Sequence, residues 1–322
     1  MSSATRLALG AVLLAALLIL PGFVPEYHLG IGIDVLLWAY LAGCWNLLGG
    51  YAGLPSLGNA LFVGAGAYTS TLFAMKAGLS PWAGMILGGL AATLLGLFIG
   101  FLSFRYGIRG PYFALVTLAF AEIIVKTVDN IPPMGGAHGL NLPFGSDPLR
   151  FQFSGKLPYY YIVFLMLAGL LFLTRMLSRR RTGYYFLAIR ENEAAAQAMG
   201  VNLMRYKLTA TALSAFLSAL GGTFYAQYHE FIHPDSVLGM GVSLEILIYA
   251  IVGGVGFVMG PLVGAALLIP LDETIRVLLG AKETQGVHLM IIGAVLVFVV
   301  LKMPDGILGW ARKRLAAGGA RS

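Results

Sequence analysis

The chain has 322 residues, of which 58% are apolar and only 11% charged, and its net charge is +7. With a mean hydropathy of +0.83, this composition excludes an ordinary soluble globular domain and indicates a polytopic membrane protein. Its apolar runs are continuous rather than alternating, which disfavours a membrane β-barrel and predicts an all-α fold. The one cysteine, Cys44, cannot form a disulfide within the chain and is expected to be a small core residue.

Apolar runs close to the roughly 20 residues that a membrane-spanning helix needs recur along the whole chain. They predict about ten spans, at residues 6–24, 33–50, 58–76, 82–104, 111–129, 158–177, 208–228, 242–257, 260–279 and 287–302. The 43 glycines indicate close helix packing or broken helices within one transmembrane domain, residues 1–310. Residues 1–25 could be a signal peptide, but Pro21 and Gly22 replace a cleavage site, so we expect an uncleaved first span.

Most Lys and Arg residues fall on one side of this topology. The positive-inside rule therefore predicts that both termini are cytoplasmic, as are a loop at 178–207 and a basic tail at 311–322. The loop at 130–158, rich in Gly and Pro, is then periplasmic. Epitopes at 182 and 318 should be cytoplasmic and one at 146 periplasmic. Membrane-side asymmetry explains the positive net charge without any nucleic acid partner.

Two Gly-rich breaks interrupt the apolar runs, at residues 49–58 and 253–261. Paired broken helices in transporters expose backbone groups to the substrate, so Gly53, Ser56, Gly58, Gly254 and Gly256 are candidates for the translocation path. Two tight turns with small-residue packing explain the same pattern equally well.

Four carboxylates lie in or near predicted spans: Asp34, Glu122, Glu245 and Glu273. Ionisable groups in a membrane suggest function, and here they support an ion-driven secondary transporter or channel as an alternative class. Each also has a simpler explanation. Glu122 is four residues from Lys126 and Glu273 three from Arg276, spacings that allow helical ion pairs, and the other two lie near span ends.

The segment His229-Glu230-Phe231-Ile232-His233 matches the zinc-protease pattern His-Glu-x-x-His. We expect no metal site here, because Pro234 follows directly and should end the helix that both histidines would need to share. The sequence also lacks a Gly-x-x-x-x-Gly-Lys-Ser/Thr phosphate loop. We therefore predict a protein that is not an enzyme and needs no cofactor, with any ATP energy supplied by another protein.

The charged segment 178–207 stands out in so apolar a chain. Residues 184–200 are rich in Ala and Glu and predict a helix that Gly200 would end. Arg190, Glu193 and Gln197 are three and four apart and would form one polar face. Such a helix could dock in a groove of a cytoplasmic protein or could be a solvated surface helix.

Four blocks of this sequence resemble the LivM-type permease subunits of branched-chain amino-acid ABC transporters. They are Gly50-Tyr51-Ala52-Gly53-Leu54-Pro55-Ser56-Leu57-Gly58 with Gly64–Tyr68, Arg109-Gly110-Pro111-Tyr112-Phe113-Ala114 with Thr117–Ala119, Ala188–Gly200, and Gly253-Gly254-Val255-Gly256 with Gly260, Pro261, Gly264 and Ala265. The third block is the most specific. The second adds Tyr112 and Thr117 to the candidate path residues.

The resemblance implies an importer in a bacterial inner membrane, working by alternating access. Its partners would be a second related permease subunit, two cytoplasmic ATPase subunits, a periplasmic substrate-binding protein and the lipid bilayer. It implies that the segment starting at Arg190 is the coupling helix in the ATPase groove, with Arg190, Glu191, Asn192, Glu193 and Gly200 as coupling residues. Four residues separate Glu193-Ala194-Ala195 from Gly200, one more than in the family pattern.

Urea or short amides are alternative substrates, because permeases for them are similar. We expect that replacing Arg190 and Glu193 abolishes transport but not membrane insertion, on the assumption that the spans do not depend on either side chain.

Overall fold

The computed structural model describes residues 20–22, 24–142, 145, 147–279, 293, 294, 296, 297, 299 and 301–319. These residues are almost entirely helical. The helices are α2 (Glu26–Trp45), α3 (Asn59–Ala77), α4 (Pro81–Arg105), α5 (Pro111–Asp129), α6 (Lys156–Ser178), α7 (Arg181–Glu191), α8 (Glu193–Ala198), α9 (Leu203–His229), α10 (Pro234–Val237), α11 (Met240–Gly253), α12 (Gly260–Leu279) and α14 (Gly306–Gly319). A π-helical turn, η2 (Asn46–Tyr51), extends α2, and four short 3₁₀ turns lie at Leu20–Gly22, Pro132–Met134, Gly136–His138 and Pro148–Arg150.

Six helical segments are long and apolar enough to cross a membrane, by length and composition. They are Glu26–Tyr51, Pro81–Arg105, Pro111–Asp129, Lys156–Ser178, Leu203–His229 and Pro234–Gly253. This confirms an all-α, multi-pass membrane protein. Helices α3 and α12 coincide with two further predicted spans but fall outside these six; α12 contains Asp272, Glu273 and Arg276. The predicted spans 6–24 and 287–302 lie largely outside the described residues, so the number ten stays a prediction.

Several predicted boundaries differ from the structure, among them the start of α9 at Leu203, five residues before the predicted start. Helix α2 begins at Glu26, seven residues before the predicted start, where an acidic residue in the first turn complements the helix dipole. Helix α11 ends at Gly253 rather than at 257, because Gly254 takes a φ of 125° that no helix contains. The predicted bounds of α5 and α12 agree with the structure.

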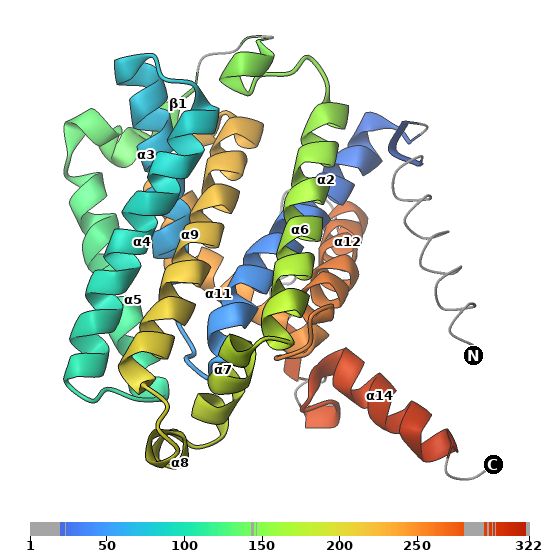
Figure 1. Cartoon of the computed structure of the whole chain (residues 1–322). Coiled ribbons are helices and arrows are strands. Elements are labelled where there is room, and N and C mark those ends of the chain that lie inside the picture. Colours follow the sequence, from blue (N-terminus) through green and yellow to red (C-terminus); the bar gives the residue numbers. More distant parts are fainter. Residues whose placement is uncertain are drawn as a thin grey trace.

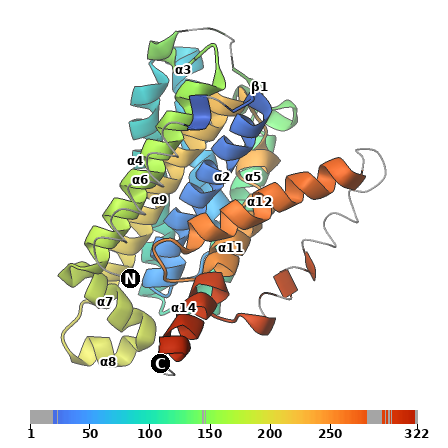
Figure 2. The same cartoon turned by 90° about the vertical axis from the view of Figure 1, so that its right-hand side faces the viewer.

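The helices form two neighbouring groups (Figure 1). Helices α3, α4 and α9 pack on one another with α5 beside them, while α2 contacts α6, α9, α11 and α12. Helices α7 and α8 lie at one end of the bundle, and the segment with β1 (Leu140–Asn141) lies at the opposite end. The view from the side shows α12 crossing the bundle obliquely and α14 near the α7–α8 end (Figure 2).

Glycines allow α3 and α9 to approach unusually closely. A methyl group on Gly66 would overlap the carbonyl of Ala219, and one on Gly222 would overlap the carbonyl of Val63. The contact is thus reciprocal, with a glycine of each helix against the backbone of the other. Close backbone approach of this kind replaces the hydrophobic driving force that lipid cannot supply between helices.

The predicted outer loop at 130–158 is ordered where the structure describes it. Strand β1 pairs antiparallel with β2 (Phe231–Ile232), with Leu140 opposite Ile232 and Asn141 opposite Phe231. Phe151 is buried with a φ of 58°, and its carbonyl accepts a hydrogen bond of 3.1 Å from the hydroxyl of Tyr159 at the start of α6. The loop is therefore attached to both α6 and the end of α9.

Candidate functional site

The charged segment between α6 and α9 forms two helices rather than the single predicted one. Helix α7 ends at Glu191, and Asn192 has extended backbone angles (φ −159°, ψ 107°). The side-chain oxygen of Asn192 accepts a hydrogen bond of 3.0 Å from the backbone N–H of Ala195 and so begins α8. Asparagine favours this capping position over a helix interior, which explains the corner. The helix proposed from Arg190 to Gly200 is thus divided at Asn192.

Arg190 points from the end of α7 into the first Gly-rich break. Its Nη1 donates a hydrogen bond of 2.7 Å to the carbonyl of Gly50. Gly53 has a φ of 67°, and a methyl group on it would lie 2.9 Å from the Cα, Cβ and Cγ of Arg190. Gly53 thus has two reasons to be glycine: a left-handed backbone and the approach of the arginine.

Arg190 also contacts the second break. A methyl group on Gly256, which has a φ of 81°, would lie 2.7 Å from Nη1 of Arg190. Asn46, three residues before the first break, binds the second: its Nδ2 donates to the carbonyl of Phe257 at 2.9 Å, and its Oδ1 accepts from the N–H of Gly256 at 2.8 Å. A methyl group on Gly50, within the first break, would lie 2.8 Å from the backbone nitrogen of Gly256. The two Gly-rich breaks, more than 200 residues apart in sequence, are therefore in contact at the α7–α8 end.

Glu193, the first residue of α8, forms a partly buried charge cluster with residues of two other segments. Its Oε1 lies 2.5 Å from Nζ of Lys207 in α9, and its Oε2 lies 3.3 Å from Nε of Arg109 in the α4–α5 connection. The Lys207 side chain is only 5% exposed and sits 5.3 Å from the ring centre of Phe104. A lysine this deeply buried requires a charged partner.

We call the residues of these two sets of contacts the loop junction: Asn46, Gly50, Gly53, Arg109, Arg190, Glu193, Lys207 and Gly256. The junction connects α7 and α8 to the ends of α2, α4 and α9 and to the α11–α12 turn. Replacing Arg190 and Glu193 would therefore remove contacts of the span ends as well as contacts of the loop. Charge and spacing in the sequence singled out both residues, but not the partners Asn46, Arg109 and Lys207. A polar Asn46 within an apolar span was the one available signal.

The opposite face of α8 is open. Met199 is 85% exposed, and Glu191, Ala194, Ala195 and Gly200 are also exposed. This face of α8 is therefore accessible from outside the described part of the chain. On the junction side, by contrast, a cavity of about 470 Å³ lies between α8, the start of α9 and the α4–α5 connection, and Arg109, Glu193 and Lys207 line it.

The candidate path residues do not gather at one place. Ser56, Gly58 and Thr117 lie together in the interior, where the N–H of Leu57 donates to Oγ1 of Thr117 at 3.2 Å and a methyl on Gly58 would overlap the Thr117 carbonyl. Gly254 packs against Gly260 and Gly306 in the α11–α12 turn. Tyr112, on α5, is separate and 72% exposed. Their roles in a path stay predictions.

The His-Glu-x-x-His segment is not helical. Helix α9 ends at His229, Glu230 has a left-handed φ of 55°, and Phe231–Ile232 forms strand β2. His233 then caps α10, its Nδ1 accepting from the N–H of Asp235 at 3.3 Å. The two histidines therefore do not share the helical face that the zinc motif requires.

Two of the four membrane carboxylates line a cavity of about 560 Å³ near the start of α2. They are Asp34 and Glu273, and the latter accepts a hydrogen bond of 2.8 Å from the hydroxyl of Tyr27. Arg276 pairs with Asp272 at 3.1 Å, which leaves Glu273 to Tyr27. Lys126 pairs with Asp129 at 3.7 Å rather than with Glu122. Both basic residues that the sequence spacing paired with a membrane carboxylate therefore bind a different carboxylate.

Comparison with known proteins shows the family to which the chain belongs. The family model described as the permease component of branched-chain amino acid transport systems matches residues 27–300. The chain belongs to this permease family. Helices α3 to α12 and both breaks fall within the matched region, and α2 begins one residue before it. This permease is therefore a multi-pass membrane subunit of an ABC importer.

Two LivM relatives are similar in sequence over most of the permease, and a LivH relative over part of it. The high-affinity branched-chain amino acid transport system permease protein LivM of Escherichia coli K12 is 29% identical over 94% of this chain and 76% of its own length. A probable LivM permease of Methanocaldococcus jannaschii is 24% identical over 82% of this chain and 88% of its own. The LivH permease of E. coli K12 is 27% identical over 44% of each chain. No solved structure matches the chain significantly.

Proposed function

We propose that this permease imports branched-chain or similar amino acids as one half of a path shared with a second, related permease. Support comes from the names of its relatives, since E. coli K12 has both a LivM and a LivH permease of a branched-chain amino acid system. Two cytoplasmic ATPase subunits would drive the cycle, and a periplasmic binding protein would deliver the substrate. Urea or short amides are the alternative substrate class.

The loop junction supports a coupling role for α7 and α8. In this proposal, the exposed face of α8 with Met199 and Gly200 docks on an ATPase, and the face with Arg190 and Glu193 transmits the movement. Arg190 reaches both Gly-rich breaks through Gly50 and Gly256. A displacement of α7 therefore moves the carbonyls and N–H groups of both breaks, unless these contacts separate.

Two states must differ in free energy for such coupling to drive transport. Glu193 contacts Arg109 and Lys207, which lie on different segments, so the two states would differ in how closely Glu193 approaches each of these cations. Loss of the contact with the buried Lys207 is costly, whereas the contact with the exposed Arg109 can lengthen at little cost. We infer that ATPase closure shifts Glu193 and Arg190 together and alternately opens each side of the path.

The proposed orientation has the α7–α8 end in the cytoplasm and the β1–β2 end in the periplasm. The basic residues of 178–207 support it by the positive-inside rule. Epitopes at 318 and 146 should be reached from the cytoplasmic and periplasmic sides, respectively. The opposite labelling would overturn this orientation.

Uptake of labelled leucine into cells that contain the complete transporter tests the function. We expect uptake to stop when the ATPase subunits are inactivated and to continue when ion gradients are dissipated. The reverse result would favour the ion-driven transporter that the carboxylates suggested. Competition by urea or short amides, but not by valine or isoleucine, would favour the alternative substrates.

A further inference from the structure

Helix α5 has two faces of different character. One face is buried against its neighbours, and its residues are Phe113, Ala114, Thr117, Ala121, Val125 and Val128. The other is left open by this chain, and its residues are Tyr112, Leu115, Ala119, Glu122, Ile123, Lys126 and Thr127. The open positions recur at three- and four-residue intervals, so they form one stripe along the whole helix.

The open faces of α4 and α6 provide a comparison. Between its ends, α4 exposes Ile86, Leu90, Leu94 and Phe98, and α6 exposes Leu165 and Phe172. These faces contain no charged residue in their central part. They have the composition that contact with lipid requires. The open stripe of α5 differs from both because it contains Glu122.

Glu122 lies well inside α5, a helix that is long and apolar enough to cross a membrane. It is seven residues from Asp129 and eleven from Pro111, hence about 10 Å from one helix end and about 16 Å from the other at 1.5 Å per residue. A carboxylate at this depth is costly in contact with lipid, and such groups face a protein interior or a water-filled cavity.

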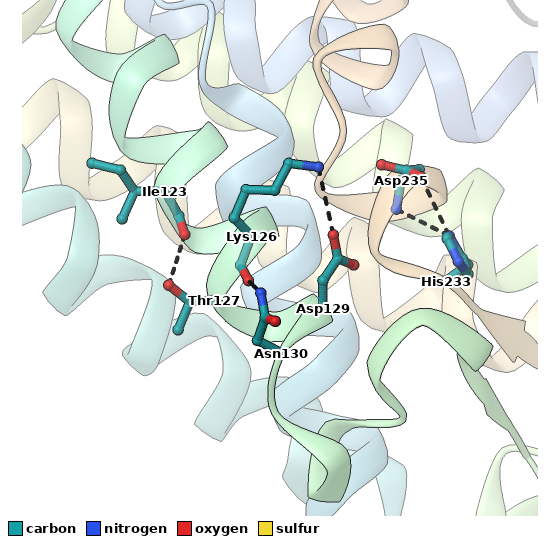
Figure 3. Close-up of polar contacts among 7 residues, drawn as sticks. All are labelled: Ile123, Lys126, Thr127, Asp129, Asn130, His233 and Asp235. Atoms are coloured by element: carbon teal, nitrogen blue, oxygen red, sulfur yellow. Dashed lines mark hydrogen bonds and ion pairs between the residues drawn. The ribbon is translucent and has the colours of Figure 1, made fainter.

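Within the described residues, Glu122 makes no hydrogen bond or ion pair. Lys126, one turn along α5, pairs with Asp129 at 3.7 Å, and the amide of Asn130 donates to the Lys126 carbonyl at 2.7 Å (Figure 3). The Thr127 hydroxyl donates to the carbonyl of Ile123. The polar groups around Glu122 are therefore occupied with one another, while its carboxylate is exposed and has no partner among the described residues.

From this we propose that the open stripe of α5 lines the water-filled translocation path, where Glu122 binds the ammonium group of the amino acid in transit. The proposal rests on the proposed function, which supplies the second permease across the path and a zwitterionic substrate. Water or substrate next to Glu122 removes the cost of exposing a carboxylate to lipid. Leu115 and Ile123, on the same stripe, offer apolar surface to an aliphatic side chain.

Thiol labelling in the assembled transporter tests the location. Cys44 is the only cysteine of this chain and is buried, so Cys44→Ala, or Cys44→Ser if that variant assembles poorly, gives a background free of thiols in this chain. Leu115→Cys and Ala119→Cys keep Glu122, and Leu90→Cys and Leu94→Cys on α4 are the matched controls. A water-soluble methanethiosulfonate should modify 115 and 119, should be slowed there by leucine, and should not modify 90 and 94.

Transport kinetics of Glu122→Gln and Glu122→Asp test the carboxylate. We expect the KM for leucine to rise about tenfold or more in Glu122→Gln, because the ammonium loses a charged partner, and to recover in large part in Glu122→Asp. Lys76→Gln, at the exposed end of α3 and outside the stripe, should leave the KM unchanged.

Equal labelling of the α4 and α5 positions, or no labelling of α5, overturns the path assignment. An unchanged KM in Glu122→Gln overturns the role of the carboxylate. ATP-driven leucine uptake is measured in vesicles that contain the transporter used for labelling. If uptake persists while the α5 positions stay unlabelled, the proposed function holds and only this inference fails. If uptake itself is absent, the proposed function fails.

Discussion

Nη1 of Arg190 donates a 2.7 Å hydrogen bond to the carbonyl of Gly50, a residue 140 positions earlier in the chain. The acceptor belongs to the π-helical turn at the end of α2, where a carbonyl is free for a side chain. The same guanidinium lies against Gly256 in the second break. One side chain of the α6–α9 connection therefore contacts the irregular ends of two spans.

Arg190→Ala should reduce leucine uptake by roughly tenfold or more, because Gly50 loses its donor and the two breaks lose a shared contact. Arg190→Lys should restore little, since an ammonium lacks the planar fork that reaches both breaks. Uptake is measured at equal amounts of assembled transporter. Arg181→Ala, at the exposed start of the same helix, is the control and should transport normally. Normal uptake by Arg190→Ala would exclude the proposed role.

Gly53→Ala should be more damaging than Gly78→Ala. The two glycines have nearly the same φ, 67° and 63°, so alanine meets a similar backbone strain of roughly 1–2 kcal/mol at each. Only at Gly53 does a methyl group also meet Arg190, since nothing lies within 4 Å of Gly78. Apparent unfolding temperatures and leucine uptake of the two variants measure the difference. Equal effects would show that the Arg190 contact contributes nothing.

Glu193→Gln should destabilise the protein by roughly 3–5 kcal/mol, because Lys207 is left buried without a charged partner. The double variant Glu193→Gln/Lys207→Met should recover most of that stability, since it removes the uncompensated charge. Thermal unfolding of the purified protein measures both. Lys126→Gln, which breaks an exposed pair, serves as the control and should cost less than about 1 kcal/mol. If Glu193→Gln were as stable as this control, the buried Lys207 would not need Glu193 as its charged partner.

Met199→Asp should weaken the attachment of the ATPase subunits without unfolding the permease. Its side chain is 85% exposed at the end of α8, so a carboxylate there is solvated in the free permease but not in an apolar groove. Co-purification of the ATPases measures the effect. Leu149→Asp, at a 75% exposed site at the other end of the bundle, should leave co-purification unchanged. Equal co-purification of both variants would place the docking surface elsewhere.

Sequence reasoning located the charged segment, both Gly-rich breaks and the residues Arg190 and Glu193, because each departs from a uniformly apolar background. It was wrong about the continuous helix, since composition favoured helix through Asn192 while the capping hydrogen bond to Ala195 favoured a corner. It also missed Lys207 and Arg109, whose importance comes only from their nearness to Glu193. Whether Glu122 faces lipid, water or protein could not be read from its spacing to Lys126, because that lysine had a competing partner in Asp129.

The sequence by itself determined the class of this protein and most of its helices. The reason is local: in a membrane, each helix satisfies its own backbone hydrogen bonds, so a run of apolar residues is sufficient to specify one. Only the tertiary structure decided that the two breaks meet, that Arg190 and Glu193 face the spans while Met199 faces away, and that α5 leaves a charged stripe open. Those outcomes depend on which residues distant in sequence pack together, a property of the assembled helices that no local pattern contains.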